Sequence, residues 1–360
     1  MISSLNWSTA VFIGIISLGP ITTAFLVLLI RYFKEKYQHD LYMAMGWFSI
    51  FIWCVFWIFA NLLLSEIIFI YCIYTIIPAA FLIIFLVDHI NRESVDPFKI
   101  FIVTAVSAIA IFTTLEPNNV IKHTYPNGEQ GLTYTGSILI GGSLLFLLAG
   151  GMYIYCMAKI YYQAPKNLKS ISSLSLVGSI LVGLLSSVTT ISSLIFIIPG
   201  LHMLVTTTGA LLTAIAFAYE PRLAFILPFR VLRLTVIETK SGISIFSHIW
   251  NKLDPIDEHL LSGVLQSISL ILNQALKKGN IREIQLEQAT LILRRSEKFS
   301  VICVLITTKS SRSLRLALNS FAKKFFTNFS PYFSNPNILN NFEAASDLIS
   351  EIFAFIPEYS

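Results

Sequence analysis

The stretch VLRLTVIETKSGISIFSHIW, residues 231–250, marks the point at which the chain changes its hydrophobic periodicity. Two runs of alternating apolar and polar residues flank TKSG, a pattern typical of a β-hairpin. Gly242 supplies the positive φ that a tight hairpin turn tends to need. The residues before this stretch are mostly long apolar runs. The change predicts a membrane domain followed by a water-soluble sheet, because a helix in lipid satisfies its own backbone whereas strands pair with neighbours.

The composition agrees with a chain that lies largely in a membrane. Of its 360 residues, 55% are hydrophobic and only 12% are charged, whereas soluble domains carry about 25% charged residues. Most of the 25 Lys and Arg residues follow Glu220. We therefore predict a membrane domain over residues 1–220, a juxtamembrane linker over 221–230 and a cytoplasmic domain over 231–360.

Seven apolar segments are candidate membrane spans, and a spanning helix needs about 20 residues. They are residues 9–30, 41–60, 67–87, 100–115, 134–158, 171–195 and 201–219. The segment 100–115 is the weakest of them. The first apolar run has no basic segment before it and is too long for a signal peptide, so we expect it to be retained.

The placement of Lys and Arg predicts how the spans are oriented, since cytoplasmic loops carry the excess of positive charge. One side of the membrane would hold the basic residues of 31–40, 88–99 and 159–170, together with those that follow the last span. The other side would hold Lys122 alone. The N-terminus is therefore expected outside the cell membrane, and the domain after the last span is expected in the cytoplasm.

The spans carry no Asp, Glu, Lys or Arg near their middles. Ionisable residues inside a membrane usually mark ion or proton pathways. Their absence argues against a proton-coupled transporter, an intramembrane aspartyl protease and a voltage sensor. The span 201–219 also lacks the lysine that a retinal Schiff base requires.

Aromatic and polar residues in three spans form a candidate ligand pocket. Trp53 and Trp57 share one helix face by their i,i+4 spacing, either for packing or as an aromatic wall. His202 lies near the outer end of the last span, with Thr206 one turn deeper. The polar loop 116–133, the longest on the outer side, could cover an outward-facing pocket.

The span 171–195 is rich in small hydroxyl residues. Ser175, Ser179, Gly183 and Ser187 recur every four residues and so share one face. Such a face lets helix backbones approach closely, or it lines a small-molecule cavity. We include Ser179 in the candidate pocket on the second interpretation. No Gly-x-Ser-x-Gly elbow or partnering His favours a serine nucleophile.

The four cysteines give no disulfide framework or zinc site. Cys54, Cys72 and Cys156 lie in apolar runs, Cys303 lies in a predicted strand, and none forms a C-x-x-C pair.

Three arginines follow the last span. Pro221 ends the helix because its ring cannot continue the hydrogen-bond ladder. Arg222, Arg230 and Arg233 then suit anionic lipid headgroups at the membrane surface.

The cytoplasmic domain has a readable order of elements. After the hairpin we expect a helix that begins at Asp254 and stops at Gly279. Three strands follow, then a helix from about Ser311 to Asn328, and a last helix capped by Asn340 and Glu343. The strands are residues 282–288, 290–296 and 299–308. The order ββαβββαα predicts an α+β domain with a five-stranded antiparallel sheet.

This domain resembles the longin and roadblock families of the profilin-like fold. The stretches LTVIETKSGISIFSHIW, DEHLLSGVLQSISLIL and FSVICVLIT carry the resemblance, together with the helices that follow. The longin variant fits best because the hairpin comes first and two helices come last. The resemblance implies a non-enzymatic platform that binds a small GTPase, another trafficking factor or a second copy of itself.

The membrane part resembles the seven-span sensor region at the N-terminus of some histidine kinases. The exit AIAFAYEPRLAFILPFRVLRL, in which the last span runs through Pro-Arg into the next domain, carries this similarity. No phosphoacceptor His helix follows, and no Gly-rich ATP-binding motif is present. The resemblance therefore implies sensing without kinase activity.

These observations together favour a non-enzymatic membrane sensor or scaffold. We expect the bilayer and a cytoplasmic protein, such as a small GTPase, as partners, with a homodimer as a further option. We expect no cofactor and no nucleic-acid partner. The alternative is a transporter or channel with a regulatory cytoplasmic domain, which the polar face of residues 171–195 motivates. An intramembrane enzyme acting on lipid is a third hypothesis, for which no Ser and His constellation stands out.

Overall fold

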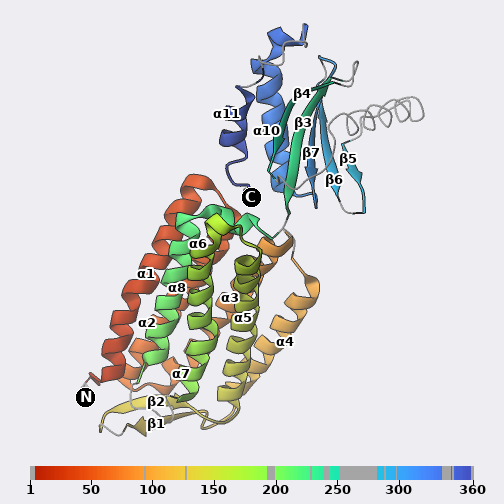
Figure 1. Cartoon of the computed structure of the whole chain (residues 1–360). Coiled ribbons are helices and arrows are strands. Elements are labelled where there is room, and N and C mark those ends of the chain that lie inside the picture. Colours follow the sequence, from red (N-terminus) through yellow and green to blue (C-terminus); the bar gives the residue numbers. More distant parts are fainter. Residues whose placement is uncertain are drawn as a thin grey trace. The chain divides into compact units, whose positions relative to one another are not determined.

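The computed structural model divides the chain into two compact units, Met1–Ala224 and Phe225–Ser360 (Figure 1). The division falls within the predicted linker 221–230. The residues described are 5–92, 95–125, 128–192, 199–227, 229–238, 243–250, 282–287, 289–296, 298–334, 342 and 344–357.

The first unit is a helical bundle with a short β-hairpin at one end (Figure 1). Its long helices are α1 (Thr9–Glu35), α2 (Gln38–Leu63), α3 (Glu66–Arg92), α4 (Pro97–Thr113), α5 (Gly136–Gln163) and α8 (Leu201–Tyr219). Between α5 and α8 runs a composite helix of η1 (Lys166–Leu168), α6 (Lys169–Ile180), the π-helical η2 (Leu181–Leu185) and α7 (Ser186–Ser192). The hairpin pairs β1 (Val120–Thr124) with β2 (Gln130–Tyr134), and η3 (Pro221–Phe225) follows α8.

Six helices of the described chain are long and apolar enough to cross a membrane: α1, α2, α3, α5, the composite helix over Lys166–Thr189, and α8. They are consistent with a multi-pass membrane protein. The remaining predicted span, 100–115, is found as the helix α4 of 17 residues. It is about 25 Å long, whereas the hydrocarbon core of a bilayer is about 30 Å thick. Six candidate spans are therefore shown rather than seven.

The helix α4 nevertheless belongs to the bundle. Its Val103 is fully buried and packs in a cluster with Ala80 and Ile84 of α3 and with Leu145 and Ala149 of α5. Asp96 caps α4 by accepting a hydrogen bond from the Phe98 amide at 3.0 Å. The short helix is thus fixed at its first turn and along its buried face.

Two pairs of glycines bring the composite helix against its neighbours. A methyl group added at Gly178 would lie 2.7 Å from the Gly209 carbonyl of α8. A methyl group added at Gly150 of α5 would lie 2.7 Å from the Gly183 Cα. Both contacts are with backbone, which cannot move aside as a side chain can. Small residues here allow close helix packing, as the packing interpretation of residues 171–195 predicts.

The second unit contains a five-stranded antiparallel sheet in the order β4-β3-β7-β6-β5. The strands are β3 (Val231–Glu238), β4 (Ser244–Ile249), β5 (Glu283–Gln285), β6 (Thr290–Arg295) and β7 (Val301–Thr307). The predicted hairpin and the antiparallel sheet are therefore confirmed. The predicted helix from Asp254 to Gly279 lies outside the described residues. Asn340 and Glu343, which were predicted to cap the last helix, lie outside them as well.

Helices α10 (Arg312–Asn328), η4 (Ser330–Ser334) and α11 (Ala345–Ile352) complete the described part of this unit. The Ser311 side chain caps α10 by accepting a hydrogen bond from the Leu314 amide at 3.1 Å. Phe321 and Phe325 of α10 contact the ring of Phe246 on β4, and Phe353 contacts Trp250. Aromatic side chains thus join the helices to one face of the sheet.

Replacing Gly178 with Ala should destabilise the bundle by about 1–3 kcal/mol, because the new methyl group meets backbone. The matched control is Gly151→Ala, since nothing lies within 4 Å of a Cβ there. That change should be neutral or stabilising by about 0.5–1 kcal/mol through lower unfolded-state entropy. Thermal melts of both variants in detergent measure the difference, and equal melting temperatures would contradict the close crossing.

Candidate functional site

A cavity of about 120 Å³ lies in the first unit, between the helices and the β-hairpin. Side chains of α2, α3, α5, α7 and α8 line it, together with residues of the hairpin. A single water needs only about 10–15 Å³ of such space. The cavity is therefore large enough for a small organic molecule.

Two tryptophans and a histidine form one wall of the cavity. Trp53 and Trp57 project from successive turns of α2, and their rings lie 5.8 Å and 5.7 Å from the imidazole of His202. Gly200, with φ of +81°, turns the chain into α8 and so places His202 in its first turn. The structure thus brings together three residues of the predicted pocket, and His202 is only 9% exposed.

Thr206 supports this wall from behind. It is fully buried and donates a hydrogen bond to the His202 carbonyl at 2.7 Å. Its hydroxyl therefore accepts the 2.6 Å hydrogen bond from Ser186, which does line the cavity. Thr206 joins α7 to α8 but is not among the lining residues of the described chain.

Ser179 lies elsewhere in the bundle. It is fully buried, and its hydroxyl donates to the Leu176 carbonyl at 2.7 Å. It is not among the described residues that line the cavity, because it lies about two helical turns before Ser186 on the composite helix. Ser186 and Ser187 take the place that the sequence interpretation gave to Ser179.

The β-hairpin forms the end of the cavity. His123 and Tyr125 line it from the first half of the hairpin, and residues 132–134 line it from β2. The Tyr134 hydroxyl donates to the Phe69 carbonyl at 2.7 Å, and the two rings pack with centroids 4.3 Å apart. Burial raises the pKa of Tyr134 well above its usual value, so the phenol stays a hydrogen-bond donor.

The hairpin is also tied to the start of α1. The Asn6 side chain donates to the Gln130 carbonyl at 2.9 Å and to the Asn61 carbonyl at 3.0 Å. Glu129 accepts hydrogen bonds from both the amide and the hydroxyl of Thr9. These bonds hold the loop predicted to cover a pocket, residues 116–133, over the helix ends.

The opposite end of the bundle contains a buried ion pair that the sequence interpretation did not identify. Arg31 at the end of α1 lies 3.3 Å from the carboxylate of Asp40, which is fully buried near the start of α2. His39 lies 3.5 Å from the other oxygen of the same carboxylate. The sequence does contain an Arg and an Asp on either side of a short loop, but their spacing alone does not show that the two side chains pair.

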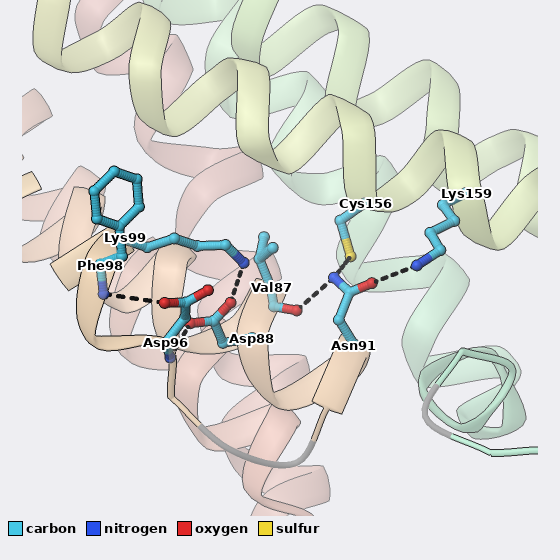
Figure 2. Close-up of polar contacts among 8 residues, drawn as sticks. All are labelled: Val87, Asp88, Asn91, Asp96, Phe98, Lys99, Cys156 and Lys159. Atoms are coloured by element: carbon cyan, nitrogen blue, oxygen red, sulfur yellow. Dashed lines mark hydrogen bonds and ion pairs between the residues drawn. The ribbon is translucent and has the colours of Figure 1, made fainter. Parts of the chain in front are cut away.

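A second polar cluster joins α3, α4 and α5 at the same end (Figure 2). The buried carboxylate of Asp88 accepts hydrogen bonds from Lys99 and from the Asp96 amide. Asn91 donates to the Val87 carbonyl at 2.7 Å and to the Cys156 sulfur at 3.6 Å, and it accepts from Lys159 at 3.3 Å. Each buried polar group here has a partner, so the cluster fastens helices together rather than presenting a reactive group.

The three arginines of the predicted membrane-surface patch are placed differently from one another. Arg222 is half-buried and binds both oxygens of Glu220, at 2.6 Å and 2.7 Å. Arg230 is exposed. Arg233 is 3% exposed because it lies on β3, an interior strand whose two faces are both covered, so its surface assignment is corrected.

Metal ligands are not gathered in the described chain. No group of three or more His, Cys, Asp or Glu in these residues could hold a metal ion. The four cysteines are free and buried.

No family model, no curated protein and no solved structure matches this chain.

Replacing Arg31 with Leu should destabilise the bundle by about 3–5 kcal/mol, because it leaves the Asp40 carboxylate buried without its cation. The double variant Arg31→Leu/Asp40→Leu should recover most of that loss. Chemical unfolding in detergent measures both, with Lys34→Leu as an exposed control on the same helix. A double variant no more stable than Arg31→Leu would show that the two groups do not interact.

Proposed function

We propose that this protein is a non-enzymatic membrane sensor. Its helical unit binds a small ligand in the cavity beneath the β-hairpin, and its second unit recruits a cytoplasmic protein. The observation that carries the proposal is the cavity itself, in which Trp53, Trp57 and His202 converge from two helices.

The proposed topology places the hairpin end outside the cell and the charged end inside. Asn6, Thr9 and the hairpin share one end of the bundle, through their mutual hydrogen bonds. The basic residues of the loops after α1, α3 and α5 belong to the opposite end, as the positive-inside rule requires. A helix of about 17 residues, such as α4, is at the short limit for a membrane span. If α4 crosses the membrane, the chain has seven spans and the second unit lies in the cytoplasm.

The helix α8 is the proposed link between ligand and output. His202 in its first turn lines the cavity, and Glu220 follows its last residue. Hydrogen bonds from Arg222 hold the pKa of Glu220 below its usual value, so the pair stays charged and closes the turn after the helix. A ligand that displaces the first turn of α8 would therefore shift the segment that leads into the second unit.

The second unit is the proposed recruitment platform. Its antiparallel sheet, with the hairpin first and two helices last, supports the longin-like interpretation. The partner that this interpretation favours is a small GTPase, with another trafficking factor or a second copy of the chain as the other options.

A transporter or channel is the second candidate function. A smaller cavity of about 20 Å³ shares Ile76 and Phe146 with the larger one. A path through the bundle would pass between these two side chains. Solute flux in proteoliposomes that exceeds protein-free liposomes, and that falls in Phe146→Trp, would favour this function over sensing.

Cysteine labelling in intact cells tests the topology. Because the four native cysteines are buried, they should give little background with a membrane-impermeant maleimide. Lys122→Cys, on the exposed face of β1, should label in intact cells. Lys166→Cys, also exposed, should label only after permeabilisation. The reverse pattern, or labelling of both in intact cells, would contradict the proposed orientation.

Binding to small GTPases tests the output. The full chain in lipid nanodiscs should bind at least one member of a panel in a manner that depends on GDP or GTP. A chain that ends at Ala224 is the control and should bind none. If the panel shows no binding and crosslinking in native membranes attaches no cytoplasmic protein to residues 225–360, the recruitment proposal fails.

A further inference from the structure

We propose that the cavity opens sideways into the lipid between α5 and α7, and that it binds an uncharged hydrocarbon group drawn from the bilayer. This inference rests on the proposed function only in that the cavity is taken as the ligand site. It adds the route by which the ligand arrives and the chemical class that this route selects.

One side of α5 passes from contact with the composite helix to the cavity. Ser143, Leu147, Gly150 and Ile154 follow one another at helical spacing, so they share this side. Gly150 and Ile154 lie against Gly183 of the composite helix. Ser143 and Leu147, which are nearer the hairpin, line the cavity. The cavity therefore begins on this side of α5 just beyond the crossing of Gly150 with Gly183.

The composite helix shows the same change. Ser187 lies one turn after Gly183, and its hydroxyl donates to the Gly183 carbonyl at 2.6 Å. Ser187 also lines the cavity. Because α7 lies at the hairpin end of the bundle (Figure 1), Ser187 and Leu147 are on the same side of the crossing. They therefore border the cavity from two neighbouring helices.

The lining residues at this place reach the outer surface of the unit. Leu147 is 49% exposed, and Ser143 and Ser187 are half-buried. The lining tryptophans of α2, Trp53 and Trp57, are buried by contrast. The exposure of these α5 and α7 residues places the proposed opening between the two helices.

The proposed opening lies at the depth of the lipid chains. Leu147 is about three helical turns, or about 16 Å, from Gly136 at the start of α5. The whole helix of 28 residues is about 42 Å long, whereas the hydrocarbon core is about 30 Å thick. The exposed side chains nearby, such as Leu184 and Val188, are apolar. The opening would therefore face acyl chains rather than water.

The lining residues favour a ligand without charge. None of the described residues that line the cavity is Asp, Glu, Lys or Arg. An ion in such a site would lose its hydration with no opposite charge to replace it, at a large cost in free energy. An ion would pay the same cost on a route through lipid, so the route and the site select the same class.

The size and walls of the cavity suit a ring or a short length of hydrocarbon chain. An apolar protein cavity of about 150 Å³ is known to admit a molecule the size of benzene, and this one measures about 120 Å³. Trp53, Trp57 and Phe69 supply aromatic surfaces for apolar contacts. The acyl chain of a phospholipid and a free lipid-soluble molecule share this chemistry.

The test uses the quenching of tryptophan fluorescence by bromine, which acts only at close range. The parent is the full chain with Trp7→Phe, because Trp7 is exposed. It is placed in nanodiscs of phosphatidylcholine that carries two bromine atoms on one acyl chain. Trp53 and Trp57 report on the cavity, and Trp47 and Trp250 stay the same in every variant. Each variant is compared with itself in nanodiscs without bromine.

Gly142→Leu is the variant that fills the cavity. Gly142 lines it, and the nearest atom to a new Cβ is the movable end of Ile73 at 3.0 Å. We expect brominated lipid to cause a larger loss of fluorescence in the parent than in Gly142→Leu. Ser187→Leu, which narrows the opening, should also reduce the loss, whereas Val188→Leu at the exposed neighbouring position should not. Thermal melts in detergent check folding, and Ser187→Leu replaces Gly142→Leu if the latter does not fold.

Two small probes in ordinary phosphatidylcholine nanodiscs separate the source and the charge of the ligand. Bromobenzene dissolves in lipid, whereas 4-bromobenzoate stays in water as an anion. We expect bromobenzene to quench the parent more than Gly142→Leu, and 4-bromobenzoate to quench both equally. A difference with brominated lipid shows that an acyl chain enters, and a difference with bromobenzene alone shows that the ligand is a free lipid-soluble molecule.

The outcomes separate this inference from the proposed function. If filling the cavity changes the quenching by none of the three probes, the cavity is not a ligand site and both proposals fail. If filling it reduces quenching by 4-bromobenzoate, the cavity admits an ion, so the sensor proposal stands and the inferred class is overturned. If Ser187→Leu and Val188→Leu have equal effects, the cavity does not open between α5 and α7, and the inferred route is overturned.

Discussion

The close approach of backbones at two glycine pairs is the constraint on which the geometry of the bundle depends. Gly178 meets Gly209 of α8, and Gly183 meets Gly150 of α5, with no room for a methyl group at either place. The π-helical turn Leu181–Leu185 contains Gly183, and Ser186 and Ser187 come directly after it. The composite helix is thus pinned to both neighbours just before the residues that face the cavity. Beyond these glycines, larger side chains and the hairpin surround the cavity.

Polar groups mark the two ends of this bundle and serve different purposes. At the hairpin end, hydrogen bonds from Asn6 and Thr9 hold a polar loop over the cavity. At the other end, Asp40 and Asp88 are fully buried carboxylates, paired with Arg31 and Lys99 on neighbouring helices. Charges buried in this way cost free energy unless they are paired, so each pair favours one arrangement of the helices over others. The cavity thus lies at one end of the bundle, and the buried ion pairs lie at the other.

The sequence predicted the larger features because they depend on periodicity and composition. The helices, the hairpin at Val231–Ile249 and the antiparallel sheet follow from apolar spacing, turn residues and capping residues such as Ser311. Trp53, Trp57 and His202 line one cavity, and the sequence singled them out because aromatic and polar residues stand out in an apolar span. Ser179 was misassigned because a four-residue repeat predicts which residues share a helix face but not what that face contacts. The π-helical turn also changes which of the later residues lie on the same face. The burial of Arg233 was not predicted because the local pattern of β3 does not show that both faces of this strand are covered. The Arg31–Asp40 pair needed the packing of α1 against α2, which spacing alone does not supply.

The proposal that the cavity beside His202 binds a small molecule can be tested by crystallography. Crystals of the full chain grown with 4-bromophenol would reveal the ligand through the anomalous signal of bromine. We expect one strong peak inside the cavity, beside the rings of Trp53, Trp57 and His202. Bromine peaks confined to the lipid-facing surface, or a cavity filled by repacked side chains with no bromine in it, would contradict it.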